Sequence, residues 1–308
     1  MDKIPLIVIS GPTASGKTAL SVELAKEFNA EIVSADSMQI YKYMNIGTAK
    51  PTLDERRRVV HHLMDIIEPD VPFSVAQYVE MAHSSISDIK NRNKNAVVVG
   101  GTGLYINSLV DDVDFLENDS DTKIREELTK IAKEKGIDYL VDELRTFDPV
   151  SAEKIHKNNE RRIIRAIEFY KMTGKPISTH QEETKKKESR YSPFMMAIKW
   201  DIEKLYERIE KRVDIMICDG LISEVEKLLD MGYTNEMLSM QGIGYKEIIE
   251  YLNGTISKDE AIYKIKIGTR HYAKRQMTWF RRDERILWID YRDDVLDTAR
   301  EYLKSNGF

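Results

Sequence analysis

The sequence predicts an α/β protein, in which a parallel sheet flanked by helices is interrupted by an all-helical insertion. The strongest observation is a strand, a glycine-rich loop and a helix in direct succession over residues 4–28. Apolar, β-branched runs of strand length recur at Glu31–Ala35, Asn95–Val99 and Phe194–Trp200, with a shorter run at Ile286–Ile289. Between about Leu116 and Ser192 the pattern is charged and helical. We therefore expect a core of residues 1–115 and 193–308 and a helical insertion domain at 116–192.

The helices follow from apolar residues at helical spacing and from capping residues. Ser74 and Gln77 form a capping box at the start of one of them. The expected helices are Thr18–Phe28, Ser74–Asn91, Leu104–Leu109, Asp121–Lys135, Ile137–Phe147, Pro149–His156, Asn159–Thr173, Ile202–Met216 and Gly268–Arg282. Ser37–Pro51 is polar and aromatic with little periodicity, which predicts a functional loop with some helix. His61–Pro72 is expected to be irregular, and Lys185–Arg190 to be a solvated loop.

The glycine-rich loop matches G-x-x-x-x-G-K-[ST], the motif of a phosphate-binding loop, and predicts a P-loop NTPase-like, nucleoside-kinase-like sheet. The loop consists of Gly11, Pro12, Thr13, Ala14, Ser15, Gly16, Lys17 and Thr18. Its glycines allow successive backbone N–H groups to converge on phosphate oxygens at a helix N-terminus. Lys17 adds a full positive charge, and the Thr18 hydroxyl is placed to bind Mg²⁺ that the phosphates also hold. The loop therefore predicts a site for at least two linked phosphates.

The composition is that of an ordinary globular protein, with 42% hydrophobic and 32% charged residues. Cys218 is the single cysteine, which excludes an internal disulfide and a multi-cysteine zinc site and is typical of a reducing compartment. No apolar run approaches the ~18 residues that a membrane span needs, and the first strand begins almost at the N-terminus. We therefore expect a cytoplasmic enzyme with no signal peptide and no membrane segment.

The net charge of −5 argues against a nucleic-acid partner, but the distribution of charge along the chain argues for one. Lys264–Arg285 contains eight Lys and Arg against two acidic residues, and Lys154–Lys175 contains seven against two. Because salt screens charges beyond ~8 Å, a phosphate group responds to the nearby cluster more than to distant acids.

The helix expected at Gly268–Arg282 interleaves basic and aromatic residues. The basic residues on one stripe are Arg270, Lys274 and Arg281, and the aromatic residues that can pack inward are Tyr272, Trp279 and Phe280. Asn159–Arg165 offers a second basic cluster. A solvated helix face explains one such cluster well and two less well, so contact with a phosphate backbone is the favoured interpretation.

Two polar residues follow core strands at the edge where ligands usually bind in an open sheet. Asp36 follows the second strand and either accepts a proton from a second substrate or caps the next turn, and the sequence weighs these about evenly. Gly100–Gly103 follows the third strand, where many phosphate-loop NTPases place a magnesium-binding acid. Within it, the Thr102 hydroxyl can reach a phosphate or bridging oxygen, or cap the next helix. The missing acid weakly disfavours an ordinary ATPase.

The helix expected at Ile202–Met216 contains two arginines without an acidic partner on the same helix. Arg208 is flanked at its i±3 and i±4 positions by two lysines, a leucine and Arg212, and Arg212 also lacks an acid there. Like charges at this spacing destabilise a helix by roughly a few tenths of a kcal/mol each unless an anion faces them. A pyrophosphate group is favoured for that role over solvent or a distant carboxylate.

Together these stretches resemble the tRNA dimethylallyltransferase (isopentenyltransferase) family. The matching stretches, in family order, are GPTASGKT at Gly11, SADSMQIYKYMNIGTAKP at Ser34, HHLMDI at His61, VVVGGTGLY at Val97, NNERRIIRA at Asn158, RIEKRVDIM at Arg208, GIGYKE at Gly242 and TRHYAKRQMTWFRRD at Thr269. They span nearly the whole chain, while the insertion at about Leu116–Arg190 matches less distinctly. The resemblance is therefore much more specific than the phosphate loop alone.

The resemblance implies a prenyl transfer from dimethylallyl diphosphate to tRNA. The five-carbon group goes to the exocyclic N6 amine of the adenosine 3′-adjacent to the anticodon (position 37), and diphosphate leaves. Catalytic roles are implied for Asp36, Thr102 and Arg208, and diphosphate binding for the phosphate loop and Arg212. Lys17, the loop amides and Mg²⁺ at Thr18 then stabilise the negative charge on the departing diphosphate. Asp36 matches the residue that accepts the proton of the amine.

The resemblance also implies a tRNA anticodon stem-loop as partner, with the target adenosine flipped out of its stack. The implied tRNA contacts are Asp36, Ser37, Met38, Gln39, Thr102, Lys123, Glu160, Arg161, Arg162, Ile163, Ile164, Gly242, Ile243, Gly244, Tyr245, Lys246, Arg270, Lys274, Arg275 and Arg281. The helical insertion is expected to clasp the stem-loop from the other side, and the protein is expected to act as a monomer.

Three other functions stay open on the residues alone. A small-molecule kinase that uses ATP suits the first 36 residues equally well. An enzyme that prenylates free adenine nucleotides is related, but it has no need for the two basic clusters. A non-catalytic RNA-binding protein has no need for Lys17 and Thr18. The basic clusters and the acid-free third strand favour a tRNA substrate and a diphosphate donor other than ATP.

Overall fold

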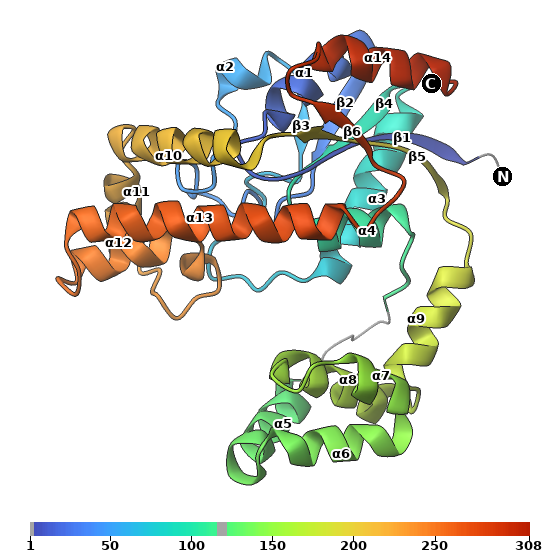
Figure 1. Ribbon diagram of the computed structural model, residues 1–308, viewed down its shortest axis with the longest axis vertical. Helices are drawn as coiled ribbons and strands as arrows, with labels where there is room; N and C mark the ends of the chain where they lie inside the picture. The colour runs from blue at the N-terminus through green and yellow to red at the C-terminus, as the bar shows by residue number, and fades with distance from the viewer. Residues whose placement is uncertain (1–2, 116–121) are drawn as a thin grey trace. The chain divides into compact units, whose positions relative to one another are not determined.

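The computed structural model describes residues 3–115 and 122–308, and the chain divides into two compact units (Figure 1). Unit 1 comprises Met1–Val110 and Arg190–Phe308, and unit 2 comprises Asp111–Ser189. The domain boundary expected at Leu116 and the first residue of the helix predicted from Asp121 lie outside the described residues.

Unit 1 is built on a parallel sheet of six strands in the order β3-β2-β4-β1-β5-β6. The strands are β1 (Ile4–Ser10), β2 (Ala30–Ser34), β3 (His61–His62), β4 (Asn95–Val99), β5 (Tyr191–Lys199) and β6 (Leu287–Asp290). The central strands are continuous apolar runs because both faces of the sheet are covered, and residues 6–9 of β1 are 0% exposed. Since parallel strands end at the same edge, the loops after β1, β2 and β4 meet there.

Helices cover both faces of this sheet (Figure 1). Those of unit 1 are α1 (Lys17–Glu27), α2 (Leu53–Arg56), α3 (Val75–Asn91), α4 (Gly103–Val110), α10 (Ile202–Cys218), α11 (Leu221–Asp230), α12 (Tyr245–Leu252), α13 (Lys258–Phe280) and α14 (Val295–Ser305). Helices α1 and α14 pack with Ile7, Ile9 and Ile32 on one face, and α3 packs against β2 and β4 on the other. Helices α10 to α13 enclose a second apolar cluster that includes Val213 and Ile248. No described helix has the length and apolar character needed to cross a membrane.

Unit 2 consists of helices only, within its described residues. They are α5 (Thr122–Lys135), α6 (Ile137–Phe147), α7 (Pro149–Lys154), α8 (Glu160–Thr173) and α9 (Ile177–Lys186). Their apolar stripes meet in a core of their own, in which Leu128, Leu140, Leu144, Ile163 and Ile167 are 0% exposed. Unit 2 therefore has its own hydrophobic interior, as a separate domain requires.

Four local predictions were wrong, each where long-range contacts decide the structure. Ser37–Pro51 contains turns and no helix, because side chains from elsewhere hold its backbone. Part of the expected irregular segment forms the two-residue strand β3, which pairs with Ile32 and Val33 and is too short to show a period. Helix α9 covers the start of the loop expected at Lys185–Arg190. Helix α13 begins about ten residues before Gly268, at a cap in which Ser257 accepts the N–H of Glu260.

Candidate active site

The loops after β1, β2 and β4 line a cavity of about 620 Å³ in unit 1, together with residues of α10, α12 and α13. Its lining includes Thr13, Ala14, Ser15, Gly16, Lys17, Thr18, Asp36, Ser37, Met38, Gln39, Gly100, Gly101, Arg208, Arg212, Gly242, Ile243, Gly244, Tyr245, Tyr272, Arg275 and Gln276. The fold thus brings the phosphate loop, the acid after β2 and the two arginines of α10 that lack an acidic partner on their own helix to one site.

The phosphate loop presents backbone N–H groups without protein acceptors. Gly11 (φ +129°) and Gly16 (φ +97°) adopt positive φ angles that glycine tolerates best. Across the part of the chain that the structure describes, no acceptor contacts the N–H groups of residues 14–18. The buried hydroxyl of Ser15 also lacks a partner there. Such a set of unsatisfied donors at the N-terminus of α1 is suited to bind an anion.

Side chains bind three of the carbonyl oxygens of the loop. The bonds are Lys17 Nζ to the Pro12 oxygen (2.6 Å), Arg208 Nε to the Ala14 oxygen (2.8 Å) and Trp200 Nε1 to the Ser15 oxygen (3.0 Å). Each donor satisfies a negative dipole that would otherwise repel a phosphate group. The loop is therefore held by the protein in an anion-binding conformation.

Lys17 has an ionisation state that depends on what occupies the cavity. Burial lowers the pKa of Lys17 to about 7, the nearby carboxylate of Asp36 raises it, and the positive charge of Arg212 lowers it. A diphosphate beside the ammonium group favours the charged form and raises the pKa again. Lys17 is therefore a full positive charge when an anion is bound.

Arg208 is held in a fixed orientation on the phosphate loop. Its guanidinium carbon lies 4.4 Å from the ring centroid of Trp200, which in turn stacks on Tyr291 at 4.2 Å. Since Nε is bonded to Ala14, the terminal N–H groups are left for a ligand. Neither Arg208 nor Arg212 forms an ion pair with any described carboxylate, as their helix positions indicated.

The two carboxylate oxygens of Asp36 lie in different surroundings. Its Oδ1 accepts the N–H groups of Met38 (2.9 Å) and Gln39 (3.3 Å) and so caps the turn after β2. Its Oδ2 has no donor among the described residues. Burial raises the pKa of this carboxyl, while the turn N–H groups, Lys17 and Lys50 oppose the rise. One oxygen is therefore structural, and the other is suited to accept a proton.

Thr102 supports the segment after Asp36 from outside the cavity wall. Its hydroxyl accepts the N–H of Ser37 (3.0 Å) and lies 3.2 Å from the Ser37 hydroxyl, to which it donates. The loop before it also packs closely, because a Cβ on Gly100 would lie 2.1 Å from the carbonyl oxygen of Ala35. The β2 and β4 loops are therefore locked together, and the Thr102 hydroxyl is bonded to Ser37 in this structure.

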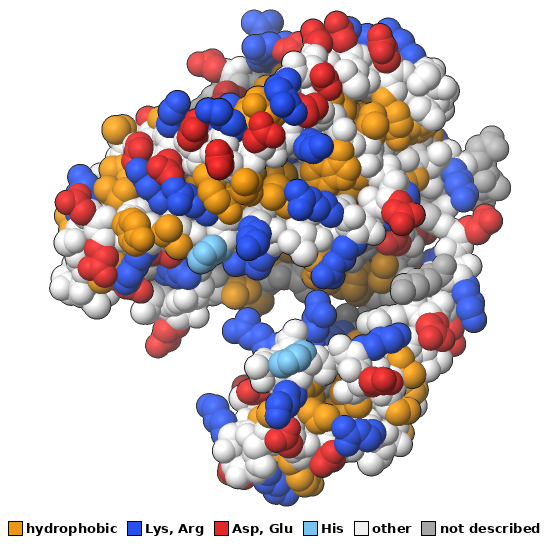
Figure 2. Space-filling model, in the orientation of Figure 1, with side chains coloured by type: hydrophobic (Ala, Val, Ile, Leu, Met, Phe, Trp, Pro, Cys, Tyr) orange, Lys and Arg blue, Asp and Glu red, His pale blue; other side chains and the backbone are white. Residues whose placement is uncertain are grey.

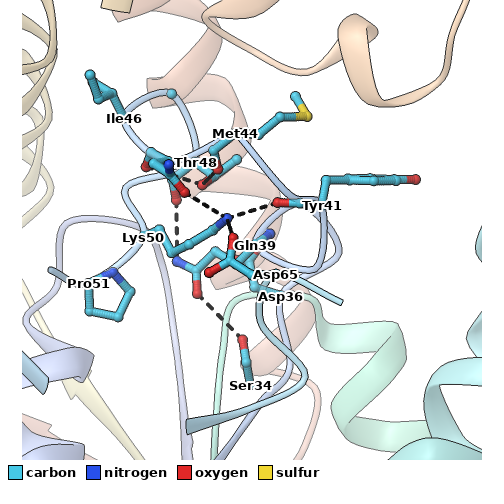
Figure 3. A network of polar contacts seen from close by, with 12 residues as sticks. Ser34, Asp36, Gln39, Tyr41, Met44, Ile46, Thr48, Lys50, Pro51 and Asp65 are labelled. Atoms are coloured by element: carbon cyan, nitrogen blue, oxygen red, sulfur yellow. Dashed lines mark hydrogen bonds and ion pairs between the residues drawn. The ribbon is translucent and has the colours of Figure 1, made fainter. Parts of the chain in front are cut away.

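A buried lysine organises the loop of residues 37–51 (Figure 3). Lys50 is 8% exposed, and its Nζ donates to the Tyr41 carbonyl (2.8 Å) and Asn45 Oδ1 (3.0 Å) and pairs with Asp65. The Gln39 amide donates to the carbonyls of residues 48 and 49, each at 3.3 Å. The side chain of Gln39, expected to contact tRNA, is thus engaged in holding this loop.

A carboxylate from α11 closes the same loop. Glu224 accepts the N–H groups of Asn45 (3.0 Å), Ile46 (2.8 Å) and Gly47 (3.1 Å) and the hydroxyl of Tyr245 (2.7 Å). Three successive N–H groups around one carboxylate leave the 45–47 turn little freedom. The position of the loop is therefore set by contacts that are distant in sequence.

The residues present fit a magnesium ion that is shared with a ligand. Thr18 lines the cavity in the first turn of α1, next to the free amides of the phosphate loop. No group of three His, Cys, Asp or Glu side chains in the described chain could hold a metal alone. Mg²⁺ commonly takes one or two protein ligands and completes its shell with phosphate oxygens and water. The donor set therefore suits Mg²⁺ only together with a bound diphosphate.

Comparison with known proteins gives the chain a family. The sequence matches the family described as IPP transferase over residues 39–283. The chain belongs to this family. It is 52% identical over 312 residues to the tRNA dimethylallyltransferase of Acetivibrio thermocellus, covering 100% of this chain and 99% of the relative. It is 51% identical over 290 residues to that of Clostridioides difficile, covering 94% and 93%.

Solved structures of IPP transferases show the same fold. The tRNA isopentenylpyrophosphate transferase of Bacillus halodurans has a TM-score of 0.73 at 41% identity and covers 99% of this chain and 96% of its own. A eukaryotic dimethylallyltransferase acting on tRNA has a TM-score of 0.85 at 31% identity, with 98% and 79% covered. The expected family and the P-loop NTPase-like sheet with flanking helices are therefore confirmed.

Along α13, the IPP transferase chain carries cations of two kinds. Lys264, Lys266 and Arg270 of this helix pair with carboxylates, and Arg270 also lies over the ring of Tyr206. By contrast, four exposed cations have no carboxylate partner in the described chain: Lys274 and Arg275 in the C-terminal half of α13, and Arg281 and Arg282 directly after it. Figure 2 shows basic side chains recurring along the exposed surface of α13 beside hydrophobic ones. Within the predicted basic stripe, Arg270 therefore pairs with Glu210, whereas Lys274 and Arg281 have no carboxylate partner in the described chain.

Unit 2 presents a second group of cations at the start of α8. Arg161 and Arg162 are exposed and have no carboxylate partner among the described residues, while Arg165 pairs with the buried Glu168. Glu160 and Lys123 are also exposed.

Three of the residues expected to contact tRNA have buried side chains. Ile163 and Ile164 are 0% and 5% exposed and pack in the core of unit 2, since they share a helix face with Ile167. Tyr245 is 1% exposed, packs on Gly47 and bonds Glu224. The two isoleucine side chains stabilise the core of unit 2, whereas Tyr245 also lines the cavity. Gly242, Ile243 and Gly244 line the cavity, and Lys246 is exposed beside it.

Three residues that act on the site were not singled out from the sequence. Trp200 and Glu224 hold the phosphate loop and the 45–47 turn, and Gln276 bridges two of the loops that line the cavity. Each is a polar group whose partners lie far away along the chain. The one available signal was a polar Gln276 on the apolar side of α13, next to Ala273 and Met277.

Proposed function

We propose that this IPP transferase transfers the dimethylallyl group of dimethylallyl diphosphate to the exocyclic N6 amine of the adenosine 3′-adjacent to a tRNA anticodon. The observation that carries the proposal is one cavity that holds the free amides of a phosphate loop, the open N–H groups of Arg208 and the free oxygen of Asp36. The names of the relatives support it, since several are tRNA dimethylallyltransferases.

The cavity stabilises the leaving group of this reaction. As the allylic carbon–oxygen bond breaks, its electron pair stays on the diphosphate, which gains negative charge. Lys17, Arg208 and the loop amides are already oriented toward that charge and do not have to rearrange. Arg212 adds a second guanidinium at the same wall. Mg²⁺ between Thr18 and the diphosphate would add to the charge stabilisation when bound.

Asp36 completes the reaction on the other substrate. The amine nitrogen forms its bond to the allylic carbon, and one N–H proton then passes to the open Oδ2 of Asp36. A carboxyl with a raised pKa is a better proton acceptor than an ordinary one. Because Asp36 also caps the turn of Met38 and Gln39, the base is held in place by the segment that we expect to meet the adenosine.

The RNA is held by surfaces outside the reacting centre. We assign the anticodon stem-loop to the unpartnered cations of α13 and to the exposed cations of α8 in unit 2. The flipped adenosine enters beside Ser37, Met38 and the Gly242–Gly244 turn, which line the cavity. The proposal includes a monomeric enzyme in the cytoplasm, where tRNA is modified.

The decisive experiment supplies labelled dimethylallyl diphosphate with bulk tRNA or with free AMP. Label in tRNA is the expected result. Label in AMP would favour prenylation of free adenine nucleotides, and label in neither, with ATP consumed in a parallel assay, would favour a small-molecule kinase. Binding of tRNA without any transfer would leave a non-catalytic RNA-binding protein.

A further inference from the structure

The side chain of Gln276 bridges two glycine-rich loops of unit 1. Its Oε1 accepts the N–H of Thr13 at 2.9 Å, and its Nε2 donates to the carbonyl of Gly101 at 2.9 Å. Gln276 is 5% exposed, and a Cβ on Gly101 would lie 2.1 Å from Nε2. Both the oxygen and the nitrogen of the Gln276 amide are therefore bonded, and the loop at Gly101 has no room for a side chain beside them.

These two loops follow neighbouring strands and line the same cavity. Thr13 belongs to the phosphate loop after β1, and Gly101 follows the neighbouring strand β4. The β4 loop is in turn fixed to the segment of Asp36, through the close packing of Gly100 on Ala35 and the bond of Thr102 to Ser37. Gln276 therefore connects the groups that bind the diphosphate to the group that accepts the proton.

We propose that Gln276 is a positioning residue of the prenyl transfer, which sets the distance between the phosphate loop and Asp36. The inference rests on the proposed function. In that reaction the carbon–oxygen bond breaks at the diphosphate while the amine attacks from the side of Asp36. The phosphate loop and Asp36 must therefore be in place at the same time. A misplacement of about 1 Å costs about 100-fold in rate in enzymes that depend on such alignment.

The chemistry of the side chain fits this task closely. A glutamine offers one acceptor and one donor at the end of a two-carbon stem, and here one of each is needed. The bond to Thr13 also occupies the first N–H after Pro12, so that the free donors of the loop begin at Ala14. Gln276 thereby also selects which N–H groups face the diphosphate.

Helix α13 gives this bridge a rigid support. Ala273 and Met277, on the same side as Gln276, pack with Ala14, Leu205 and Ile209 in an apolar cluster. Tyr272, on the same helix, lines the cavity together with Gln276. The exposed Lys274 and Arg275 lie between these positions in sequence. One helix thus carries both the bridging amide and two of the cations assigned to RNA, of which Arg275 also lines the cavity.

The first test replaces the amide with an apolar side chain of similar length. Gln276→Met should lower the single-turnover transfer rate about tenfold or more, with donor and tRNA both saturating. The dissociation constant for tRNA should stay within about twofold of the wild-type value. The matched control is Gln77→Met, because Gln77 also accepts a backbone N–H, that of Ser74 at 2.9 Å, but away from the cavity. It should lower the melting temperature and leave the rate unchanged.

The second test uses a carboxyl that can be switched by pH. In Gln276→Glu at about pH 8 the carboxylate still accepts the Thr13 N–H but repels the Gly101 carbonyl. At about pH 6 a protonated carboxyl, favoured by burial, restores one acceptor and one donor. The rate of this variant relative to wild type should therefore rise at least about threefold between these pH values, and the Gln276→Met ratio should stay flat.

The outcomes separate this inference from the proposed function. Wild-type protein that transfers no label to tRNA refutes the function itself. An active wild type together with a Gln276→Met rate within twofold of it, or with a loss that saturating donor fully restores, refutes only the positioning role. A Gln276→Glu ratio that is independent of pH refutes the role even if the methionine variant does not fold.

Discussion

Unit 1 and unit 2 carry their positive charges in different ways. In the cavity of unit 1, the cations are fixed by several contacts each: Arg208 is bonded to Ala14 and stacked on Trp200, and Lys17 is bonded to Pro12. At the start of α8 in unit 2, Arg161 and Arg162 extend into solvent without a carboxylate partner among the described residues. Fixed charges suit a transition state of defined geometry, whereas exposed charges suit the backbone of a large polyanion.

The difference teaches that cation counts alone do not locate an active site. The basic cluster at Lys264–Arg285 is one stretch in the sequence, but its first half is neutralised by Glu210, Asp214 and Glu250. Only its C-terminal half resembles the open surface of α8. The five predictions below test this contrast between fixed and exposed charges.

The largest effect is expected at Asp36, the proton acceptor. Asp36→Asn keeps an acceptor for the turn N–H groups but cannot take a proton, so single-turnover transfer should fall about 1000-fold. Binding of tRNA, measured by filter retention, should stay within about twofold. If affinity and turnover fell together in this variant, the residue would be a turn cap alone. Asp36→Ala also removes the cap of the turn, and it should lose the same activity. Any additional loss in tRNA affinity measures how much the capped turn contributes to tRNA binding.

The next effect concerns the fixed guanidinium of Arg208. Arg208→Met removes its contacts to both the loop and the diphosphate, and transfer at saturating tRNA should fall about 100-fold. Lys204→Met removes a charge from the same helix at an exposed position paired with Glu207, and it should retain wild-type activity. Equal losses in the two variants would mean that only the net charge of α10 matters.

A tenfold effect is expected for the exposed cations of α13. Changing Lys274 and Arg275 together to Ala should weaken tRNA binding about tenfold and reduce the slope of log affinity against log salt by about two. The control is Lys264 and Lys266 changed to Ala on the same helix, because these two already have carboxylate partners. An unchanged slope in the first variant would remove this face from the RNA interface.

The ionisation of Lys17 predicts how donor binding depends on pH. With a pKa of about 7 in the structure and a higher pKa beside diphosphate, Lys17 must gain a proton on binding above pH 7. Donor affinity should therefore be constant well below pH 7 and fall about fivefold between pH 7 and pH 8. Calorimetry at several pH values measures this. Lys17→Arg keeps its charge, so its affinity should be flat over the same range; a parallel fall would assign the effect to another group.

The smallest effect is expected in unit 2. Arg161 and Arg162 changed together to Ala should weaken tRNA binding a few-fold and reduce the salt slope by about two, with single-turnover rates unchanged at saturating tRNA. Arg145→Ala is the control, because Arg145 is also exposed but pairs with Asp142. A loss of rate at saturating tRNA would contradict the division between fixed and exposed charges.

Most of the fold could be predicted from the sequence because its signals are local. The phosphate loop, the apolar strands and the capping box of Ser74 and Gln77 each involve residues that are close in sequence. The start of α13 was also readable, from Ser257 and Glu260, but it was missed. Ile163 and Ile164 were expected to contact tRNA, while their spacing to Ile167 also indicates the buried stripe that the structure shows.

By itself, the sequence determined that this protein has a parallel α/β core, a phosphate-binding loop and the residue types of an IPP transferase, since all of these depend on neighbours along the chain. Only the tertiary structure decided how they work together. It placed Trp200 and Arg208 on the carbonyls of the loop and Gln276 between Thr13 and Gly101. The reason is physical: a hydrogen bond needs two atoms about 3 Å apart, and no pattern in the sequence fixes that distance for residues far apart along the chain.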